Sequence, residues 1–307
     1  MSELPEVIAG VDDVDCTGMD VLVTGSTSGI GRHAALALGR LGADVIVHGR
    51  DPWKGESVVD ELTALGAEAT FVRADFSDTD AVEELAATVR EETDGLDVLV
   101  NNAGGFFRGG ELTDLGVEYT FHVNHLAPYL LTAELLDHLA PDARVVTTAS
   151  GAHQGASLDL DRVTEPDAGM WAYSHSKLAN ILFATELARR LDAADRDVTS
   201  NSLHPGAIPG SGFSRFLPGP LSSLFGKLDV VPGVTSVADG AAALVNLAVS
   251  PRTADVFGRY FSGQSVTTPS DAAQDTVAAQ RLWEQSAELL DIEEPLAEPP
   301  AKTSADE

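Results

Sequence analysis

The chain has 307 residues, of which 44% are hydrophobic, and it carries 48 acidic side chains against 19 lysines and arginines. That length and apolar content suffice for one large core, and no change in composition divides the chain. The net charge of −29 repels nucleic acid and anionic membranes, so we exclude both as partners. The single cysteine, Cys16, excludes an internal disulfide and a cysteine-based zinc cluster.

The carboxylates are spread along the chain, and lysine occurs only at positions 54, 177, 227 and 302. Because molar salt screens the repulsion between such charges, we hypothesise adaptation to a salt-rich cytoplasm; the alternative is an acidic enzyme of an ordinary cell. No stretch approaches the about 20 apolar residues that span a bilayer, and the acidic N-terminus does not resemble a signal peptide. We therefore expect a soluble, cytoplasmic protein.

A glycine-rich turn between a predicted strand and a predicted helix is the first chemical signal. The apolar run 21–23 is followed by glycines at 25, 29 and 31 and then by a helical pattern of apolar residues over 34–41. Strand, glycine turn and helix together open a βαβ unit that binds a nucleotide, with the pyrophosphate on the helix N-terminus. Such turns also occur for packing reasons, so the signal alone is moderate.

Beyond this turn, strand and helix patterns alternate along the chain. Further strands are predicted at 44–48, 67–73, 96–100, 143–149, 197–203 and 259–261. Helices are predicted at 52–65, at 78–92 with Asp78 as its cap, and at 116–139, 170–191 and 237–249. The alternation predicts an α/β fold with a doubly wound parallel sheet, in which ligands bind outside the carboxyl ends of the strands.

Three segments fall outside this alternation. Residues 1–17 form an acidic lead-in, and residues 18–290 form the single predicted domain. Within it, 207–236 is rich in glycine, proline and bulky apolar residues, which predicts a lid inserted after the sixth strand. The acidic tail 291–307, rich in proline, glutamate and alanine, is expected to be disordered.

The end of the second strand bears on the choice of cofactor. An acidic residue about 20 positions beyond the glycines binds the 2′-hydroxyl of NAD, whereas an arginine accommodates the 2′-phosphate of NADP. This chain places Arg50 there, which favours NADP, and Asp51 next to it leaves NAD open. The other interpretation of Arg50 is a solvated loop charge.

Tyr173 and Lys177 stand one helical turn apart in the predicted helix 170–191 and so share a face. A phenol with a pKa near 10 is a poor acid or base at neutral pH, and a neighbouring ammonium lowers that pKa. The pair therefore fits general acid–base catalysis, and Ser150, after the fifth strand, is placed to hold a substrate oxygen. By contrast, the eight histidines have no carboxylate or cysteine at metal-ligand spacing, so we predict no metal site.

Several motifs then occur together and in one order. They are Thr24-Gly-Ser-Thr-Ser-Gly-Ile-Gly31, Asn101-Asn-Ala-Gly104, His122-Val-Asn-His125, Ser150 after its strand, Tyr173-x3-Lys177 and His204-Pro-Gly206. With these motifs, residues 14–290 resemble the short-chain dehydrogenase/reductase superfamily. Segments 258–262 and 282–286 resemble its retinol dehydrogenase and WW-domain oxidoreductase branch.

The resemblance implies a Rossmann-like sheet and hydride transfer between a nicotinamide and the alcohol/carbonyl pair of a mostly apolar small molecule. It implies that Tyr173 is the acid/base, that Lys177 lowers its pKa and holds the nicotinamide ribose, and that Ser150 orients the substrate oxygen. Asn124 would support a proton-relay water. The implied cofactor contacts are Gly25, Thr27, Ser28, Gly29, Ile30, Gly31, Arg50, Asp75, Phe76, Asn102, Ala103, Gly104, Tyr173, Lys177, Pro205 and Gly206.

Two departures from the family pattern concern the cofactor. Ser28 stands where some NADP-specific members have a basic residue, and 207–210 lacks the threonine that many members place near 209 or 210 against the carboxamide. Two alternatives stay open: a sensor that binds NADP(H) without turnover, and a reductase of activated C=C bonds. The sequence also leaves a homo-oligomer open.

Overall fold

The structure is a computed structural model that describes residues 3–108, 110–167, 169–206 and 235–297. Within these residues, eight strands form one sheet in the order β3-β2-β1-β4-β5-β6-β7-β8. Every neighbouring pair is parallel except β7 with β8. The strands are β1 (Asp20–Val23), β2 (Asp44–Gly49), β3 (Ala69–Arg73), β4 (Leu96–Asn101), β5 (Leu139–Thr148), β6 (Thr199–His204), β7 (Tyr260–Ser262) and β8 (Ser265–Val266).

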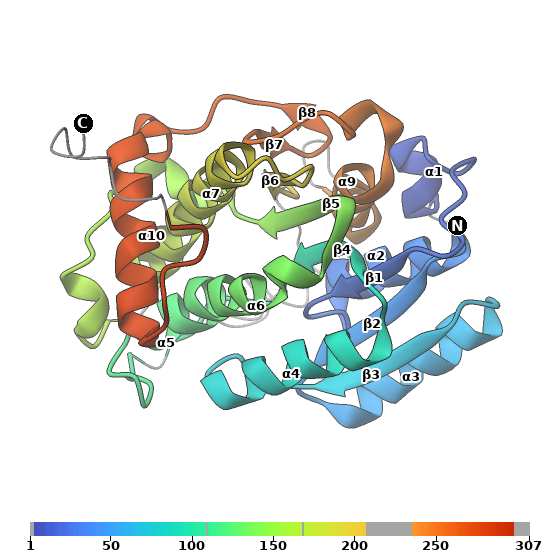
Figure 1. Ribbon diagram of the computed structural model, residues 1–307, viewed down its shortest axis with the longest axis horizontal. Coiled ribbons are helices and arrows are strands. Elements are labelled where there is room, and N and C mark those ends of the chain that lie inside the picture. Colours follow the sequence, from blue (N-terminus) through green and yellow to red (C-terminus); the bar gives the residue numbers. More distant parts are fainter. Residues whose placement is uncertain (1–2, 109, 168, 207–234, 298–307) are drawn as a thin grey trace, which may run out of the picture.

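Helices cover both faces of this sheet (Figure 1). They are α1 (Pro5–Ala9), α2 (Gly29–Arg40), α3 (Pro52–Ala64), α4 (Thr79–Glu92), α5 (Tyr119–Phe121), α6 (Ala127–Leu135), α7 (Met170–Ala193), α9 (Val237–Val249) and α10 (Thr276–Leu290). The apolar core is accordingly double: α1, α2, α3 and α9 pack on one face, and α4, α6, α7 and α10 on the other. The doubly wound, Rossmann-like parallel sheet that the sequence predicts is therefore confirmed.

The strand order reverses between β1 and β4, and this reversal locates the site. At such a switch point the connections leave β1 and β4 toward opposite faces, and a crevice opens at the carboxyl ends of the two strands. The glycine turn 24–28 follows β1 there, and the segment 102–105 follows β4.

Local signals account for several element boundaries. Val21, Leu22 and Val23 are fully buried, as expected for a strand covered on both faces. The carboxylate of Asp51 caps α3 by accepting from the Lys54 amide, and the predicted cap Asp78 accepts from the Asp80 amide at the start of α4.

The predicted helix 116–139 is wrong in its bounds. The Glu118 carboxylate accepts from two backbone amides and starts α5 at Tyr119. The chain then passes through a π-helical turn, η1 (His122–Leu126), into α6, and the helical region ends with a 3₁₀ turn at Leu136–His138. Strand β5 therefore begins at Leu139, four residues earlier than predicted, and the positive φ of 62° at Asp142 interrupts the strand pattern on which the prediction relied.

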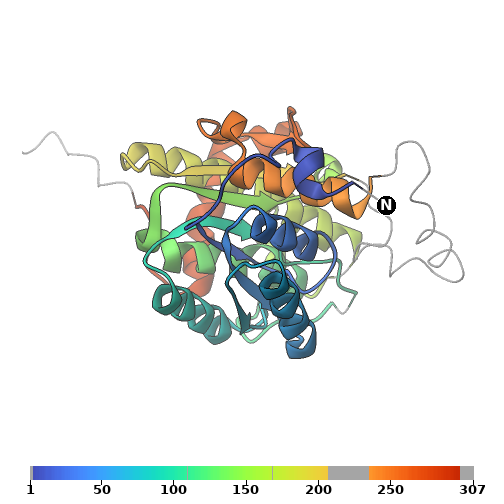
Figure 2. The same cartoon turned by 90° about the vertical axis from the view of Figure 1, so that its right-hand side faces the viewer.

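The acidic lead-in contains a short helix. Figures 1 and 2 show α1 beside α9, although the two are far apart in the sequence, and the Arg252 guanidinium donates to the carbonyls of Ala9 and Gly10. Cys16 is fully buried in the core on this face. This part of the lead-in therefore belongs to the packed structure.

The C-terminal expectation needs a correction over 291–297. The Trp283 indole N–H donates to the carbonyl of Pro295, and Arg190 pairs with Glu294 and donates to the carbonyl of Leu296. These contacts hold 291–297 against α7 and α10, so the disorder expected from 291 onward does not begin there. Most of the predicted lid, 207–234, and the last residues, 298–307, lie outside the described residues.

Candidate active site

The glycine turn after β1 packs tightly on the segment after β4. Gly25 has a φ of 67°, and a Cβ added there would lie 2.9 Å from the Cα of Ala103. A Cβ at Gly31 would lie 2.5 Å from Asn102 Nδ2 and 2.6 Å from the carbonyl oxygen of Gly25. Both positions therefore require glycine, because the obstructing atoms include backbone.

The helix that follows the turn offers an anion site. Ser28 is the N-cap residue of α2, but its side chain accepts no hydrogen bond from the helix, and no acidic residue stands in the first turn. At Gly29 an added Cβ would meet no atom within 4 Å. Free backbone N–H groups, the positive end of the helix dipole and open space together fit a pyrophosphate.

The predicted cofactor residues Asn102 and Ala103, which follow β4, form hydrogen bonds with Thr24 at the start of the glycine turn. The Thr24 hydroxyl accepts from the amides of both residues, each at 2.9 Å, and donates to the carbonyl of Val100. The Asn102 side chain donates to the carbonyl of Thr24 at 2.9 Å. The Asn102 amide group therefore shapes the turn.

His48 supports the same turn from inside the sheet, and sequence reasoning gave it no role. Its Nδ1 accepts from the Gly25 amide at 3.2 Å, and burial lowers the pKa of its ring to about 4, so the ring is neutral. The Phe76 ring stacks on His48 with centroids 4.5 Å apart and is buried. The side chain of Phe76, a predicted cofactor contact, is thus part of the core.

Arg50 and Asp75 meet where β2 and β3 end. Arg50 Nη1 lies 3.6 Å from Asp75 Oδ2, and the side chains are 59% and 46% exposed. Burial raises the pKa of Asp75, but hydrogen bonds from Ser77 and the charge of Arg50 outweigh burial, so the pKa lies below its ordinary value. The structure therefore brings these two predicted contacts together at the surface.

Tyr173 and Ser150 meet although 22 residues of chain separate them. Tyr173 lies in the first turns of α7, and Ser150 caps the 3₁₀ turn η3 (Gly151–Gly155) after β5. Burial raises the pKa of the Tyr173 phenol, and a hydrogen bond with the Ser150 side chain lowers it only in part. The pKa therefore lies above its ordinary value, contrary to the expectation from the Tyr-x3-Lys spacing.

Lys177 explains why that expectation fails. Its Nζ lies 5.9 Å from the centre of the Tyr173 ring and donates to the carbonyl of Thr148 at 3.0 Å. Asn180 Nδ2 donates to the same carbonyl at 3.1 Å. Burial lowers the pKa of the Lys177 ammonium to about 8, so its charge is lost just above neutral pH.

Asn124 lies in the π-helical turn η1, a type of distortion that is frequent at functional sites. Its Oδ1 accepts from the Gly105 amide at 2.8 Å, and its Nδ2 donates to the Gly105 carbonyl and to Ser176 Oγ, each at 2.9 Å. A Cβ at Gly104 would lie 2.6 Å from Asn124 Oδ1 and 3.7 Å from Lys177 Nζ. Asn124, Gly104 and Lys177 therefore converge.

The segment after β6 carries Pro205 and Gly206. His204 Nδ1 accepts from the Gly206 amide at 3.1 Å, and a Cβ at Gly206 would lie 2.1 Å from the Oγ1 of Thr235. The sequence has no threonine near 209 or 210, but the structure places the Thr235 hydroxyl against Gly206. Sequence reasoning missed Thr235 because it is distant along the chain.

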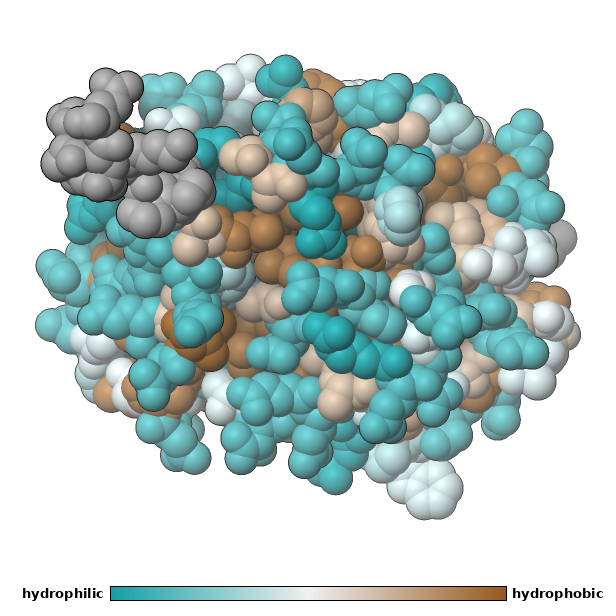
Figure 3. Space-filling view, in the orientation of Figure 1, coloured by the Kyte–Doolittle hydropathy of each residue, from teal (hydrophilic) through white to brown (hydrophobic). Residues whose placement is uncertain are grey.

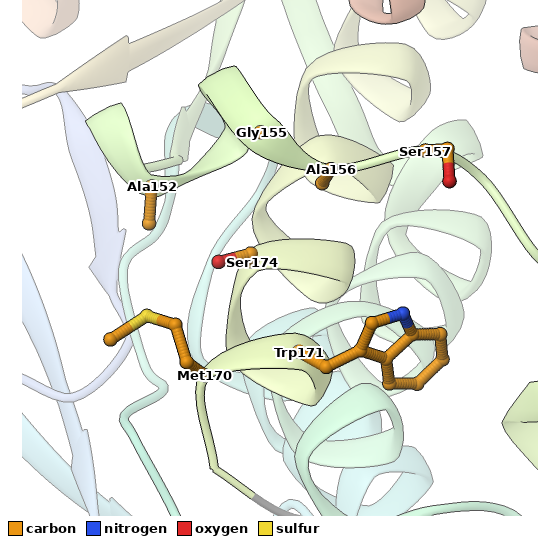
Figure 4. Close-up of a pocket in the computed structure, with 7 residues that line it drawn as sticks. All are labelled: Ala152, Gly155, Ala156, Ser157, Met170, Trp171 and Ser174. Carbon is orange, nitrogen blue, oxygen red and sulfur yellow. The ribbon is translucent and has the colours of Figure 1, made fainter.

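A cavity of about 400 Å³ is lined by residues that neighbour Ser150 and Tyr173 along the chain (Figure 4). Its walls are η3 with the residues that follow it and the first turns of α7. They contribute Ala152, Gly155, Ala156, Ser157, Met170, Trp171 and Ser174. Ala152 donates its amide to Ser150 Oγ and Ser174 follows Tyr173, so the cavity adjoins the Ser150–Tyr173 pair. No three potential metal ligands gather anywhere in the described parts of the chain.

Comparison with known proteins agrees with this arrangement. The sequence profile of the family described as short chain dehydrogenase matches residues 20–215. Retinol dehydrogenase 13 of Homo sapiens is 36% identical over 91% of this chain and 86% of its own length. A Streptomyces sp. protein, whose name describes a daunorubicin C-13 ketoreductase, is 38% identical over 88% of this chain and 92% of its own length.

Among solved structures, a short chain dehydrogenase from Burkholderia cenocepacia in complex with NADP is 30% identical, with a TM-score of 0.66. The match covers 84% of this chain and 99% of that one. The chain belongs to the short-chain dehydrogenase/reductase family, with retinol dehydrogenases among its relatives. It is an NAD(P)-dependent oxidoreductase of small molecules that acts on CH–OH and C=O groups.

No helix in the described ranges combines the length and the apolar character needed to cross a membrane. Hydrophilic side chains cover most of the face in Figure 3, in keeping with the acidic composition.

Proposed function

We propose that the protein is an NADP(H)-preferring oxidoreductase of an alcohol/carbonyl pair in a mostly apolar small molecule, with Tyr173 as the acid/base. The observation that carries the proposal is the hydrogen bond between Tyr173 and Ser150 beside an apolar cavity. Ser150 follows the carboxyl end of β5, on the side of the sheet where the glycine turn follows the carboxyl end of β1.

The residues divide the reaction between them. A nicotinamide cofactor held at the N-terminus of α2 would supply or accept the hydride. In the reducing direction the Ser150 hydroxyl holds the carbonyl oxygen, and Tyr173 gives its phenolic proton to that oxygen as the C–H bond forms. In the oxidising direction the phenolate accepts the proton of the alcohol. Lys177 would hold the ribose hydroxyls of the cofactor through its ammonium.

The protonated form of Tyr173 is the form that carbonyl reduction uses. Burial keeps the pKa of Tyr173 above its ordinary value, so the phenol enters the reaction protonated. A protonated phenol donates without prior ionisation, whereas alcohol oxidation requires the phenolate.

The proposed preference for NADP(H) rests on the contacts of Asp51 and on the exposure of Arg50. The Asp51 carboxylate accepts from the Lys54 amide as the cap of α3 and lies 3.4 Å from Lys54 Nζ, so it is engaged away from a ribose. Arg50 is more than half exposed, and its partner Asp75 is exposed as well. A 2′-phosphate would compete with Asp75 for the guanidinium.

The test is a panel of apolar ketones, aldehydes and alcohols, assayed at high salt with NADPH and with NADH. Ketone-dependent oxidation of NADPH, faster than that of NADH, is the expected result. Micromolar cofactor binding with no turnover across the panel would contradict the proposal and favour a protein that senses NADP(H) without catalysis. A saturated product that keeps its carbonyl would identify a C=C reductase.

A further inference from the structure

The cavity beside Tyr173 combines apolar walls with three polar groups that make no hydrogen bond within the described residues. Met170, Ala152 and Ala156 give it an apolar lining. The polar groups are the hydroxyls of Ser157 and Ser174 and the indole N–H of Trp171, and the last two are the more enclosed. Pockets of this kind orient a ligand through a small number of polar groups.

Ser174 differs from the other hydroxyl residues of α7. Ser176 Oγ donates to the carbonyl of Tyr173, and Thr185 Oγ1 donates to the carbonyl of Ile181, the usual local bond of such residues in a helix. The Ser174 hydroxyl makes no bond of this kind within the described residues. In Figure 4 it points between Ala152 and Met170 into the cavity.

The indole of Trp171 is held in one orientation. It stacks on the His175 ring with centroids 4.8 Å apart and an angle of 13°, and the Arg162 guanidinium lies 4.0 Å from its centre. Figure 4 shows its nitrogen edge turned toward Ala156 and Ser157, across the cavity. A ring fixed in this way presents its N–H at little entropic cost.

We propose that the Ser174 hydroxyl binds a second oxygen of the substrate, distinct from the carbonyl oxygen that Tyr173 protonates, and that the Trp171 N–H binds a further acceptor at the other end of the cavity. The substrate class is then an apolar ketone or aldehyde that also carries a hydroxyl, ether or further carbonyl group. Consecutive residues of a helix point about 100° apart, so Ser174 reaches a different part of the substrate from Tyr173. The inference rests on the proposed carbonyl reduction.

The test compares acetylnaphthalene with a set of its ring-hydroxylated analogues. We expect the wild-type protein to prefer at least one hydroxylated ketone in kcat/KM. Ser174→Ala should lower kcat/KM for that ketone about tenfold and leave acetylnaphthalene within about twofold, because only the former loses a hydrogen bond. Trp171→Phe, which keeps a ring and removes the N–H, should lower kcat/KM selectively for an analogue that is hydroxylated at a different ring position.

Ser57→Ala is the matched control, because Ser57 is an exposed serine on α3, outside this cavity, and should leave both ketones unchanged. No preference in the wild type, or equal losses for both ketones in Ser174→Ala, would overturn the inference. Calorimetric binding of the same ketones separates it from the proposed function. A Ser174-dependent affinity without turnover would overturn the carbonyl reduction alone, whereas equal affinities would overturn the second oxygen site.

Discussion

The cofactor end and the substrate end of the site are built in opposite ways. At the cofactor end there is no room for a side chain: a Cβ at Gly25 would meet the backbone of Ala103, and a Cβ at Gly31 would meet the Gly25 carbonyl and the Asn102 side chain. The substrate end is lined by residues from η3, the segment after it and α7, and within the described residues the Ser174 hydroxyl and the Trp171 N–H make no hydrogen bond. The first end tolerates almost no change, whereas the second is free to vary with the substrate.

The largest effect should come from Tyr173→Phe at the substrate end. Loss of the phenolic proton should lower kcat by about 10²–10⁴-fold, the range usual for general acid–base catalysis. The affinity for NADPH should stay within about twofold, since the change removes a single oxygen from the substrate side. Steady-state assays and fluorescence titration of NADPH measure the two quantities, and an active Phe variant would contradict the assigned role.

Gly31→Ala should break the cofactor end. The added Cβ would meet the backbone carbonyl of Gly25 at 2.6 Å, so the turn must move, at a cost of about 1–3 kcal/mol in the free energy of unfolding. NADPH binding should be largely lost. Gly155→Ala in the cavity wall is the control, because an added Cβ there meets no atom within 4 Å. It should keep NADPH binding, and equal behaviour of the two variants would contradict the contrast between the two ends.

Arg50→Ala should change the choice of cofactor but not the chemistry. A lost charged hydrogen bond of about 1.5–3 kcal/mol corresponds to a loss of NADPH affinity of roughly ten- to a hundredfold, with little change for NADH. Arg50→Lys keeps the charge but lacks the planar guanidinium, so its NADPH affinity should lie between those of the wild type and Arg50→Ala. Parallel titrations with both cofactors test this, and equal losses for both would refute a role in phosphate recognition.

Lys177 should give the site a pH dependence. Its ammonium has a pKa of about 8 when folded, against 10.5 as its ordinary value, so the unfolded chain holds more protons between these pH values. The free energy of unfolding should therefore gain from this group as pH rises from about 8 to about 10.5. Lys177→Met should abolish that gain. NADPH affinity of the wild type should instead fall above about pH 8, as the charge is lost, and a flat profile would exclude this role.

Salt should have the smallest effect on the two ends of the site, because it acts on the charged surface of the whole protein. The quantity it should change is the melting temperature. With a net charge of −29, self-repulsion should make the melting temperature rise between dilute buffer and molar salt. Differential scanning calorimetry in KCl measures the change. Equal melting temperatures would count against adaptation to a salt-rich cytoplasm.

The strand and the glycine turn at the cofactor end could be predicted from the sequence because local rules govern them. Buried runs such as Val21–Val23 predict strands, and a turn that needs glycine at 25 and 31 must show glycine in the sequence. The same holds for the cap at Asp78, whose carboxylate acts on an amide two residues away.

The substrate end could be predicted only in part. The motif identifies Tyr173, but the direction of its pKa shift depends on burial, which spacing does not reveal. The π-helical turn at Asn124 depends on contacts with Gly105 and Ser176, which belong to other elements. The positions of Thr235 beside Gly206 and of Trp171 beside Arg162 follow from the folded chain, not from any local pattern.

The short segment 291–297 gives the end of the chain a mechanical role. Arg190 lies on the same helix as Tyr173 and Lys177, and it bridges Glu186 on that helix to Glu294 beyond α10. The segment thus stabilises the C-terminal end of α7. A truncation that begins at 291 would remove the contacts of the buried Arg190 guanidinium with Glu294 and the Leu296 carbonyl and leave its ion pair with Glu186, so tags and fusions should be placed after 297.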